Sequence, residues 1–255
     1  MHGRFRCAAC GAEHGVDLRR HRCPQCGGVF SYERDAPPSF PARRDGGGRA
    51  LPPLPSGIWR FADALPTLPD PVSLGEPETP LVPLAPSPGG AGAGASCVPL
   101  ERGADEPLLP PDLDGIRVLA KCEFVLPTGS YKDRGAAVLA TWLRHLGVPE
   151  AVEDSSGNAG AALAAYAGRA GIRLKVFCPA SAAAGKLVQI RLYGAELVRV
   201  EGPRPRATEA LLEYLQQGQA VYASHLWSPL FLEGVKTLAF EVWEQLAGTP
   251  PDLVL

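Results

Sequence analysis

Residues 151–178 read AVEDSSGNAGAALAAYAGRAGIRLKVFC, and this stretch decides the fold class. The run AVED predicts a short strand, and Ala159 to Ala170 predicts an alanine-rich helix that ends at Gly171. The run LKVFC predicts a second, apolar strand that closes at Pro179. Because a helix separates the two strands, we expect them to lie parallel in one sheet.

The same alternation continues on both sides of this stretch. IRVLAKCE at 116–123 is strand-like, and a helix is predicted at 133–146, where apolar residues recur at helical spacing. Further helices are predicted at 182–193, 207–217 and 233–246, and further strands at 196–200, 220–223 and 252–255. This order predicts an α/β fold with a parallel sheet and helices on both faces. Ligands bind such sheets at the carboxyl ends of the strands, so the loops that follow strands are the candidate sites.

The composition of the 255 residues limits the classes of partner. The net charge of -2 gives no electrostatic reason to expect nucleic acid or an anionic membrane. No apolar run approaches the roughly 18 residues of a membrane helix. The first residues lack the apolar core of a signal peptide, so we expect a cytoplasmic protein. Most of the 25 basic residues are arginines, which leaves few lysines as candidates for a reactive amine.

Four cysteines form two CxxC pairs near the N-terminus: Cys7 with Cys10, and Cys23 with Cys26. Each pair can present two thiolates from one tight turn, and two such turns can close a tetrahedral Zn(II) site. In a cytoplasmic chain this pattern favours a metal over disulfides. We therefore predict a structural zinc ribbon at residues 1–34. The alternative is that the two CxxC turns are reactive or incidental.

Two stretches are rich in proline and glycine. Residues 35–79 include DAPPSFPARRDGGGRALPPLP and are expected to form a linker with little regular structure. Residues 86–104 include GGAGAGAS and are expected to be a surface insertion.

The loop PTGSYKDRG at 127–135 places Lys132 at the start of a predicted helix. The positive end of the helix dipole and the neighbouring Arg134 should both disfavour a protonated amine there, as Schiff-base chemistry requires. The alternative is an ordinary helix start at which Lys132 and Asp133 are solvated.

A second loop, DSSGNAG at 154–160, follows the strand AVED and opens the next helix. Gly157 and Gly160 would let the backbone approach a ligand closely, and successive N–H groups can bind a carboxylate. The amide of Asn158 can bond a phenolic or carbonyl oxygen. The loop is neither GxGxxG nor a P-loop, so it predicts neither a dinucleotide nor a triphosphate. The alternative is a simple N-cap turn.

Together these segments resemble the fold-type-II enzymes that depend on pyridoxal 5′-phosphate (PLP), and within them the threonine synthase family. The motifs that carry the resemblance are GEPETPL (75–81), KCEFVLPTGSYKDRG (121–135), DSSGNAGAALAAYAGRAGI (154–172), GKLVQIRLYGAELVRVEG (185–202) and EGVKTLAFEVWEQL (233–246). A four-cysteine ribbon also occurs at the N-terminus of some relatives.

The resemblance implies a tryptophan synthase beta-like α/β fold with parallel sheets. The small α/β domain would span 135–232, and the large PLP domain would combine 80–134 with 233–255. The family continues beyond a strand like DLVL into a glycine-rich loop that binds the PLP phosphate, so we expect the large domain of this chain to be incomplete, as in a truncated product. A homodimer or a complementing C-terminal fragment is the expected partner.

The resemblance also assigns roles to residues. Lys132 would hold PLP covalently and move protons as the catalytic acid and base, and Asn158 would hydrogen-bond the cofactor's 3′-hydroxyl. The substrate carboxylate would be received by Ser155, Ser156 and the loop backbone at Gly157 and Ala159. The implied activity is that of a lyase of threonine biosynthesis, which converts O-phosphohomoserine and water to threonine and phosphate.

One departure from the family pattern bears on the substrate. Where many threonine synthases read Asn-Pro-x-Arg, this chain reads Ser-Pro-Leu-Phe and ends the motif on Phe231. An arginine is the natural partner of a substrate phosphate, and Arg191 or Lys186 would have to replace it. The alternatives are therefore a related PLP enzyme, such as a dehydratase or a β-replacing enzyme on an amino acid without phosphate, and a non-catalytic remnant or interaction module.

Overall fold

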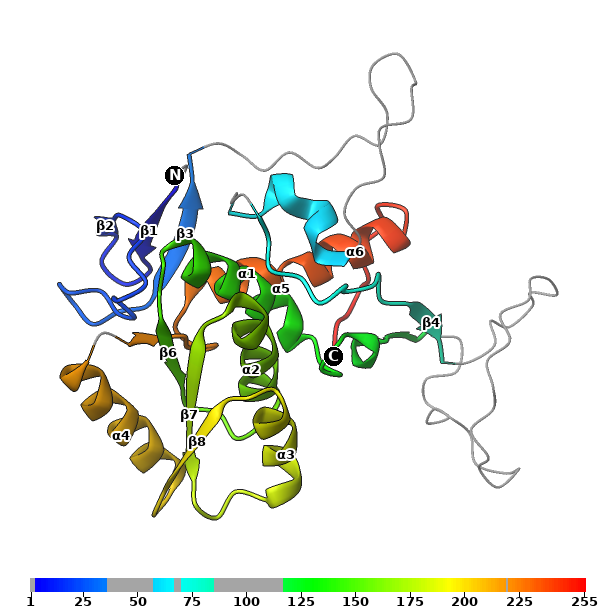
Figure 1. The fold of residues 1–255 in the computed structure, drawn as a ribbon. Helices are drawn as coiled ribbons and strands as arrows, with labels where there is room; N and C mark the ends of the chain where they lie inside the picture. The colour runs from blue at the N-terminus through cyan, green and yellow to red at the C-terminus, as the bar shows by residue number, and fades with distance from the viewer. Residues whose placement is uncertain (1–2, 36–56, 67–69, 85–116, 219) are drawn as a thin grey trace.

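A four-stranded parallel sheet lies at the centre of the computed structural model, which describes residues 3–35, 57–66, 70–84, 117–218 and 220–255, with the backbone alone for Lys186 (Figure 1). The predicted surface insertion at 86–104 lies outside these residues. The strands are β6 (Glu150–Glu153), β7 (Arg173–Pro179), β8 (Glu196–Val200) and β9 (Val221–Tyr222), in the order β8-β7-β6-β9. The parallel sheet that the sequence predicted is confirmed.

Helices join these strands and extend beyond the sheet. Their bounds are α1 (Lys132–His145), α2 (Asn158–Ala170), α3 (Ala184–Leu192), α4 (Arg204–Gln217), α5 (Pro229–Val235) and α6 (Thr237–Gln245). Helices α2 and α3 lie on one side of the sheet and α4 on the other, while α1, α5 and α6 lie above it in the view of Figure 1. Each crossover therefore carries one helix, as a parallel pair requires.

Alternate residues of the strands supply two separate cores. Ala151 and Val176 pack with α1, α2 and α3, whereas Val152 and Phe177 pack with α4. This two-residue period follows from the pleat of a strand, which points successive side chains to opposite faces. Both faces are covered, and this agrees with the apolar centre of β7, where Val176, Phe177 and Cys178 are all buried.

The N-terminal residues 3–35, here called the cysteine module, form a small antiparallel sheet of their own. It contains β1 (Gly3–Cys7), β2 (Glu13–His14) and β3 (Phe30–Arg34) in the order β2-β1-β3. The module packs against the α/β part, where the guanidinium of Arg22 lies 3.8 Å from the ring centroid of Trp227.

Part of the predicted linker is ordered and packed. A 3-10 helix, η1 (Gly57–Ala64), buries Trp59, whose indole N–H donates to the carbonyl of Val72 at 3.2 Å. Glu76 is fully buried and accepts a hydrogen bond from the hydroxyl of Tyr166 in α2. The expectation of little regular structure is therefore wrong for this part, because apolar residues among the prolines have a core to pack against. Residues 36–56 lie outside the described residues.

Three predicted elements differ in the structure. The strand-like run at 116–123 forms only β5 (Leu119–Lys121), which pairs antiparallel with β4 (Leu81–Pro83) and precedes a 3-10 turn, η3 (Glu123–Val125). The helix predicted at 233–246 is divided at Lys236 into α5 and α6. At this point the Thr237 hydroxyl donates a hydrogen bond to the carbonyl oxygen of Gly234, in competition with the helix's own backbone bonds. Residues 252–255 are exposed and form no strand, and the structure describes no strand beside them.

Helices α1 and α5 cross at very short range. A Cβ atom on Gly135 would lie 2.5 Å from the ring of Phe231, and one on Gly234 would lie 2.1 Å from the backbone oxygen of Arg134. No side chain larger than hydrogen fits at either position without moving a helix. This crossing joins the start of α1 to the C-terminal helices.

We predict that Gly234→Ala lowers the free energy of unfolding by about 1–3 kcal/mol or more, because its methyl group meets backbone that cannot rotate away. Urea unfolding of the full chain measures the change. The matched control is Gly185→Ala in α3, where open space surrounds the glycine, and it should be neutral or stabilising by up to about 1 kcal/mol. Equal stabilities of the two variants would contradict the close crossing.

Candidate active site

The lysine loop, residues 127–132, is closed by the side chain of Asp133. Its carboxylate accepts hydrogen bonds from the backbone N–H of Thr128 at 2.7 Å and from the hydroxyl of the same residue. Asp133 is fully buried, and this burial raises the pKa of its carboxyl to about 6, although the two bonds from Thr128 lower it. These two hydrogen bonds fix the turn that precedes Lys132, the first residue of α1.

Among the residues that the structure describes, no carboxylate pairs with the amine of Lys132. Its Nζ donates to the hydroxyl of Tyr131 at 2.5 Å, and the side chain is half-buried. The other lysines whose side chains the structure describes are each held by an acid: Lys121 by Glu241, Lys175 by Glu196 and Lys236 by Glu233. Within the described residues, Lys132 is therefore the lysine best suited to react as a nucleophile.

Arg134 has buried acidic partners that the sequence analysis did not identify. Its guanidinium is buried and forms ion pairs with Glu123, at 2.7 Å, and with Glu241. The two carboxylates balance the arginine's charge, and the expected effect of Arg134 on Lys132 stays a prediction. What Arg134 supplies is anchorage for the first turn of α1.

The asparagine loop, residues 154–157, follows β6 at the point where the strand order reverses. The chain runs from β6 outward to β7 and β8 and then returns to place β9 on the other side of β6. In a parallel α/β sheet the crevice at such a point, at the carboxyl ends of the strands, is the usual ligand site. Asn158 is exposed at the first position of α2.

The first backbone N–H groups of α2 are available as hydrogen-bond donors. Gly157 precedes the helix, and no side chain caps it, so the N-cap alternative finds no support. The first N–H groups of a helix have no partner within the helix, and those of Asn158, Ala159 and Gly160 can therefore face a ligand. The Ser155 hydroxyl oxygen accepts the N–H of Gly157 at 3.3 Å, which leaves its proton to donate.

Gly160 has a different role from the one predicted. A Cβ atom there would lie 2.7 Å from the backbone oxygen of Ser155 and 3.0 Å from a methyl group of Ile190. The missing side chain therefore permits tight packing of α2 on its own loop and on α3. At Gly157, by contrast, no atom lies within 4 Å of the corresponding position, so the backbone there is open to approach.

Helix α3 brings the two loops into one region. The side-chain amide of Gln189 donates to the carbonyl of Thr128 in the lysine loop at 3.0 Å. The next residue, Ile190, packs against Gly160 behind the asparagine loop. Because adjacent residues of one helix touch both loops, the loops lie near each other although about 25 residues separate them along the chain.

Two acids at the end of β6 are held by partners from other elements. Oε1 of Glu153 lies within hydrogen-bond distance of Nδ1 of His225, and burial raises the pKa of this glutamate to about 7, although His225 lowers it. Asp154 accepts hydrogen bonds from the hydroxyls of Thr208 in α4 and Tyr222 in β9. These contacts fix the backbone from which the asparagine loop departs.

Sequence reasoning missed Asp133, Glu153, His225 and Gln189. The signal for the first two was an acid beside each loop motif, in YKDRG and in VEDSSG. His225 and Gln189 gave no such signal, because His225 is 72 residues from its partner Glu153 and Gln189 is 61 residues from its partner Thr128.

The four predicted cysteine ligands come together in the cysteine module. The Sγ atoms of Cys7, Cys10, Cys23 and Cys26 all lie within 4.8 Å of one another. Those of Cys7 and Cys26 are 3.5 Å apart, and those of Cys10 and Cys23 are 3.8 Å apart. A Zn–S bond of about 2.3 Å gives an edge of roughly 3.8 Å in a tetrahedron of sulfurs, so the cluster has the size that zinc requires.

Comparison with known proteins places this arrangement in a family. Residues 97–255 match the model of the pyridoxal-phosphate dependent enzymes. The chain belongs to this family. The threonine synthase of Methanocaldococcus jannaschii is 33% identical over 98% of this chain and 56% of its own length, and that of Methanosarcina acetivorans is 32% identical over 98% of this chain and 55% of its own length. The chain spans about half the length of these curated relatives.

A solved PLP-enzyme structure agrees with the fold. The cysteine synthase of Entamoeba histolytica superposes on 67% of this chain and 47% of its own chain, with a TM-score of 0.53 and 25% identity. Among the described residues, no helix is long and apolar enough to cross a membrane.

We predict a pH-dependent contribution of Glu153 to stability. With a pKa of about 7 in the folded chain against 4.5 ordinarily, this group binds a proton more readily when folded, so its contribution to the free energy of unfolding falls as pH rises from 4.5 to 7. The free energy of unfolding of Glu153→Gln should therefore rise relative to that of the native chain over this range, by an amount of the order of 3 kcal/mol. Urea unfolding at pH 4.5 and pH 7.5 measures it, and parallel pH profiles would refute the buried pair.

Proposed function

We propose that this protein is a PLP-dependent enzyme of the threonine synthase type, with Lys132 as the amine that holds the cofactor. The observation that carries the proposal is the state of Lys132: an amine with no carboxylate partner in the described ranges, at the start of α1, on a loop held by Asp133. The family match and the threonine synthase relatives support the same assignment.

The described residues fit such a cofactor. The half-buried amine of Lys132 is accessible, the Asn158 amide is exposed, and the first N–H groups of α2 have no cap. PLP, when bound, supplies an electron sink for bonds that break at the substrate's α-carbon. In this proposal Lys132 Nζ accepts and returns protons, the Tyr131 hydroxyl orients that nitrogen, and Asn158 donates to the cofactor's 3′-oxygen.

The same loop would bind the substrate's carboxylate. Ser155 has a hydroxyl proton to donate, Ser156 is half-buried beside it, and the N–H groups at Gly157 and Ala159 lie at the positive end of α2. We infer that these four residues hold the amino acid while Lys132 moves its protons. The proposed reaction is the conversion of O-phosphohomoserine and water to threonine and phosphate.

A second candidate reaction is favoured by Phe231. This residue stands where many threonine synthases have an arginine, and it is buried against Gly135 in the helix crossing. It cannot bind a phosphate. Arg191 is exposed in the last turn of α3 and is the described residue that we propose for that role. The alternative is a dehydratase or β-replacement reaction on an amino acid without phosphate, and turnover of O-phosphohomoserine beside L-serine and L-threonine separates the two.

The four cysteines, in this proposal, hold one structural Zn(II). Four thiolates leave no open coordination position, so the metal would stabilise the module and take no part in catalysis. Gly28 fits the site because a Cβ atom there would lie 2.9 Å from the Sγ of Cys7. We also infer a small domain at 135–232 and a larger one that combines 80–134 with 233–255.

Incubation of the chain with PLP, followed by borohydride reduction, should add one cofactor to Lys132. Peptide mapping by mass spectrometry locates the added mass. The variant Lys132→Ala should lose the label, and Lys236→Ala should keep it, because Lys236 is paired with Glu233. A label absent from Lys132, or spread over all five lysines, would exclude this chain as a PLP enzyme by itself.

Elemental analysis of the purified chain should find one zinc per molecule. Cys23→Ser should remove most of it and lower the thermal unfolding temperature, because zinc binding adds directly to folding free energy. Cys122→Ala, outside the cluster, should keep the metal. Zinc bound equally by both variants would contradict the four-sulfur site.

A further inference from the structure

Residues 221–228, here called the bridging segment, contain β9 and lead into α5. This segment holds the start of the asparagine loop. The Tyr222 hydroxyl donates to Asp154, the first residue of the loop. Nδ1 of His225 lies within hydrogen-bond distance of Glu153, the last residue of β6. The position of the bridging segment therefore sets the position from which the loop departs.

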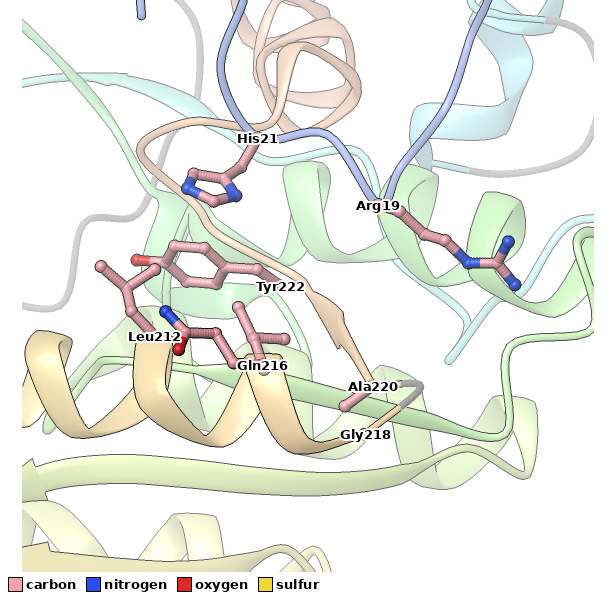
Figure 2. A pocket seen from close by; sticks show the side chains of 8 residues that line it. Arg19, His21, Leu212, Gln216, Gly218, Ala220 and Tyr222 are labelled. Atoms are coloured by element: carbon pink, nitrogen blue, oxygen red, sulfur yellow. The ribbon is translucent and has the colours of Figure 1, made fainter. Parts of the chain in front are cut away.

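The cysteine module contacts the same bridging segment. The imidazole of His21 packs edge-on against the ring of Tyr222, with centroids 5.4 Å apart (Figure 2). The guanidinium of Arg22 lies 3.8 Å from the ring centroid of Trp227. A cation in this position is attracted by the negative face of the indole ring. Two consecutive residues of the module therefore touch the segment that holds the loop.

Arg22 is fixed in turn by the second pair of cysteines. It precedes Cys23 in the chain, and Nη1 of its guanidinium donates to the carbonyl oxygen of Gly27 at 3.2 Å. The N–H of Gly27 donates to the carbonyl of Cys23 at 2.8 Å, which closes the turn that carries Cys23 and Cys26. One side chain thus joins this turn to Trp227. A metal held by the four cysteines would fix the turn and, with it, the guanidinium.

We propose that Arg22 is a positioning residue for the asparagine loop, and that the metal of the cysteine module acts on the loop through it. This inference rests on the proposed function, to which both the zinc site and the role of the loop belong. Release of the metal frees the turn, so the guanidinium leaves Trp227 and the bridging segment holds Asp154 less firmly. The loop then opens more often, and its N–H groups converge on a ligand for less of the time.

Hydrogen exchange of the full chain, read by mass spectrometry without PLP, measures the effect. The reporter peptide spans β6, the asparagine loop and the first turns of α2, residues 150–163. With zinc bound, Arg22→Ala should raise its exchange rate about two- to fivefold, the factor that a cation–π contact at a partly exposed site is worth. Removal of zinc from the native chain by a chelator should raise the rate at least as much. The peptide that contains β8, at the opposite edge of the sheet, should change in neither sample.

Two further variants separate positioning from a general loss of stability. Arg20→Ala removes an arginine of the same module that pairs with Asp17 at 3.2 Å, and it should leave the reporter peptide unchanged. Arg22→Lys should restore most of the native exchange rate, because an ammonium group also binds the face of an indole ring.

The inference is overturned if Arg22→Ala and Arg20→Ala give the same exchange in the reporter peptide, or if the β8 peptide changes as much as the reporter. It is also overturned if chelation speeds exchange in the module and leaves the reporter unchanged. Elemental analysis of the same samples distinguishes these failures from a failure of the zinc site, in which the untreated chain contains no zinc. PLP is absent from every sample, so the result does not depend on whether Lys132 holds the cofactor.

Discussion

The buried guanidinium of Arg134 is the constraint on which the rest of the structure depends. A cation removed from water costs several kcal/mol unless acids and hydrogen-bond acceptors surround it. Here those partners are Glu123, Glu241, Thr79 and Thr237, which come from the β5–α1 connection, the start of α6 and the GEPETPL motif. These segments must therefore meet at one point. Because Lys132 is two residues away in the same helix, the position of the reactive amine is set by an ion pair that takes no part in its chemistry.

The carboxyl edge of the parallel sheet is the second determinant of the site. Crossover connections leave every loop after a strand at this edge, and the strand order reverses between β6 and β9, which is where ligands of such sheets usually bind. The two acids at the end of β6 are bonded to other parts of the chain. Groups from β9, α4 and the segment after β9 bind Glu153 and Asp154, so these acids hold the backbone at the start of the asparagine loop in place.

The cysteine module contacts residues of the α/β part that in turn hold the asparagine loop in place. His21 packs on Tyr222, and Tyr222 holds Asp154, while Arg22 stacks on Trp227. A module of about 30 residues has little core of its own, and a metal would supply the missing stability. The fold of the module therefore affects the packing on Tyr222 and Trp227 as well as the cysteines.

The sequence by itself determined the local features. Periodicity and motifs are properties of neighbouring residues, and they predict the order of strands and helices from 150 to 222. They also predict the cysteine cluster and the placement of Lys132 and Asn158 at helix starts. Only the tertiary structure decided that Arg134 is neutralised by Glu123 and Glu241, that Phe231 fills the space above Gly135, and that Trp59 and Val72 pack into the core. These outcomes depend on which distant segments share a buried space, and the free energy of burying a charge or an aromatic ring is fixed by those partners and not by sequence neighbours.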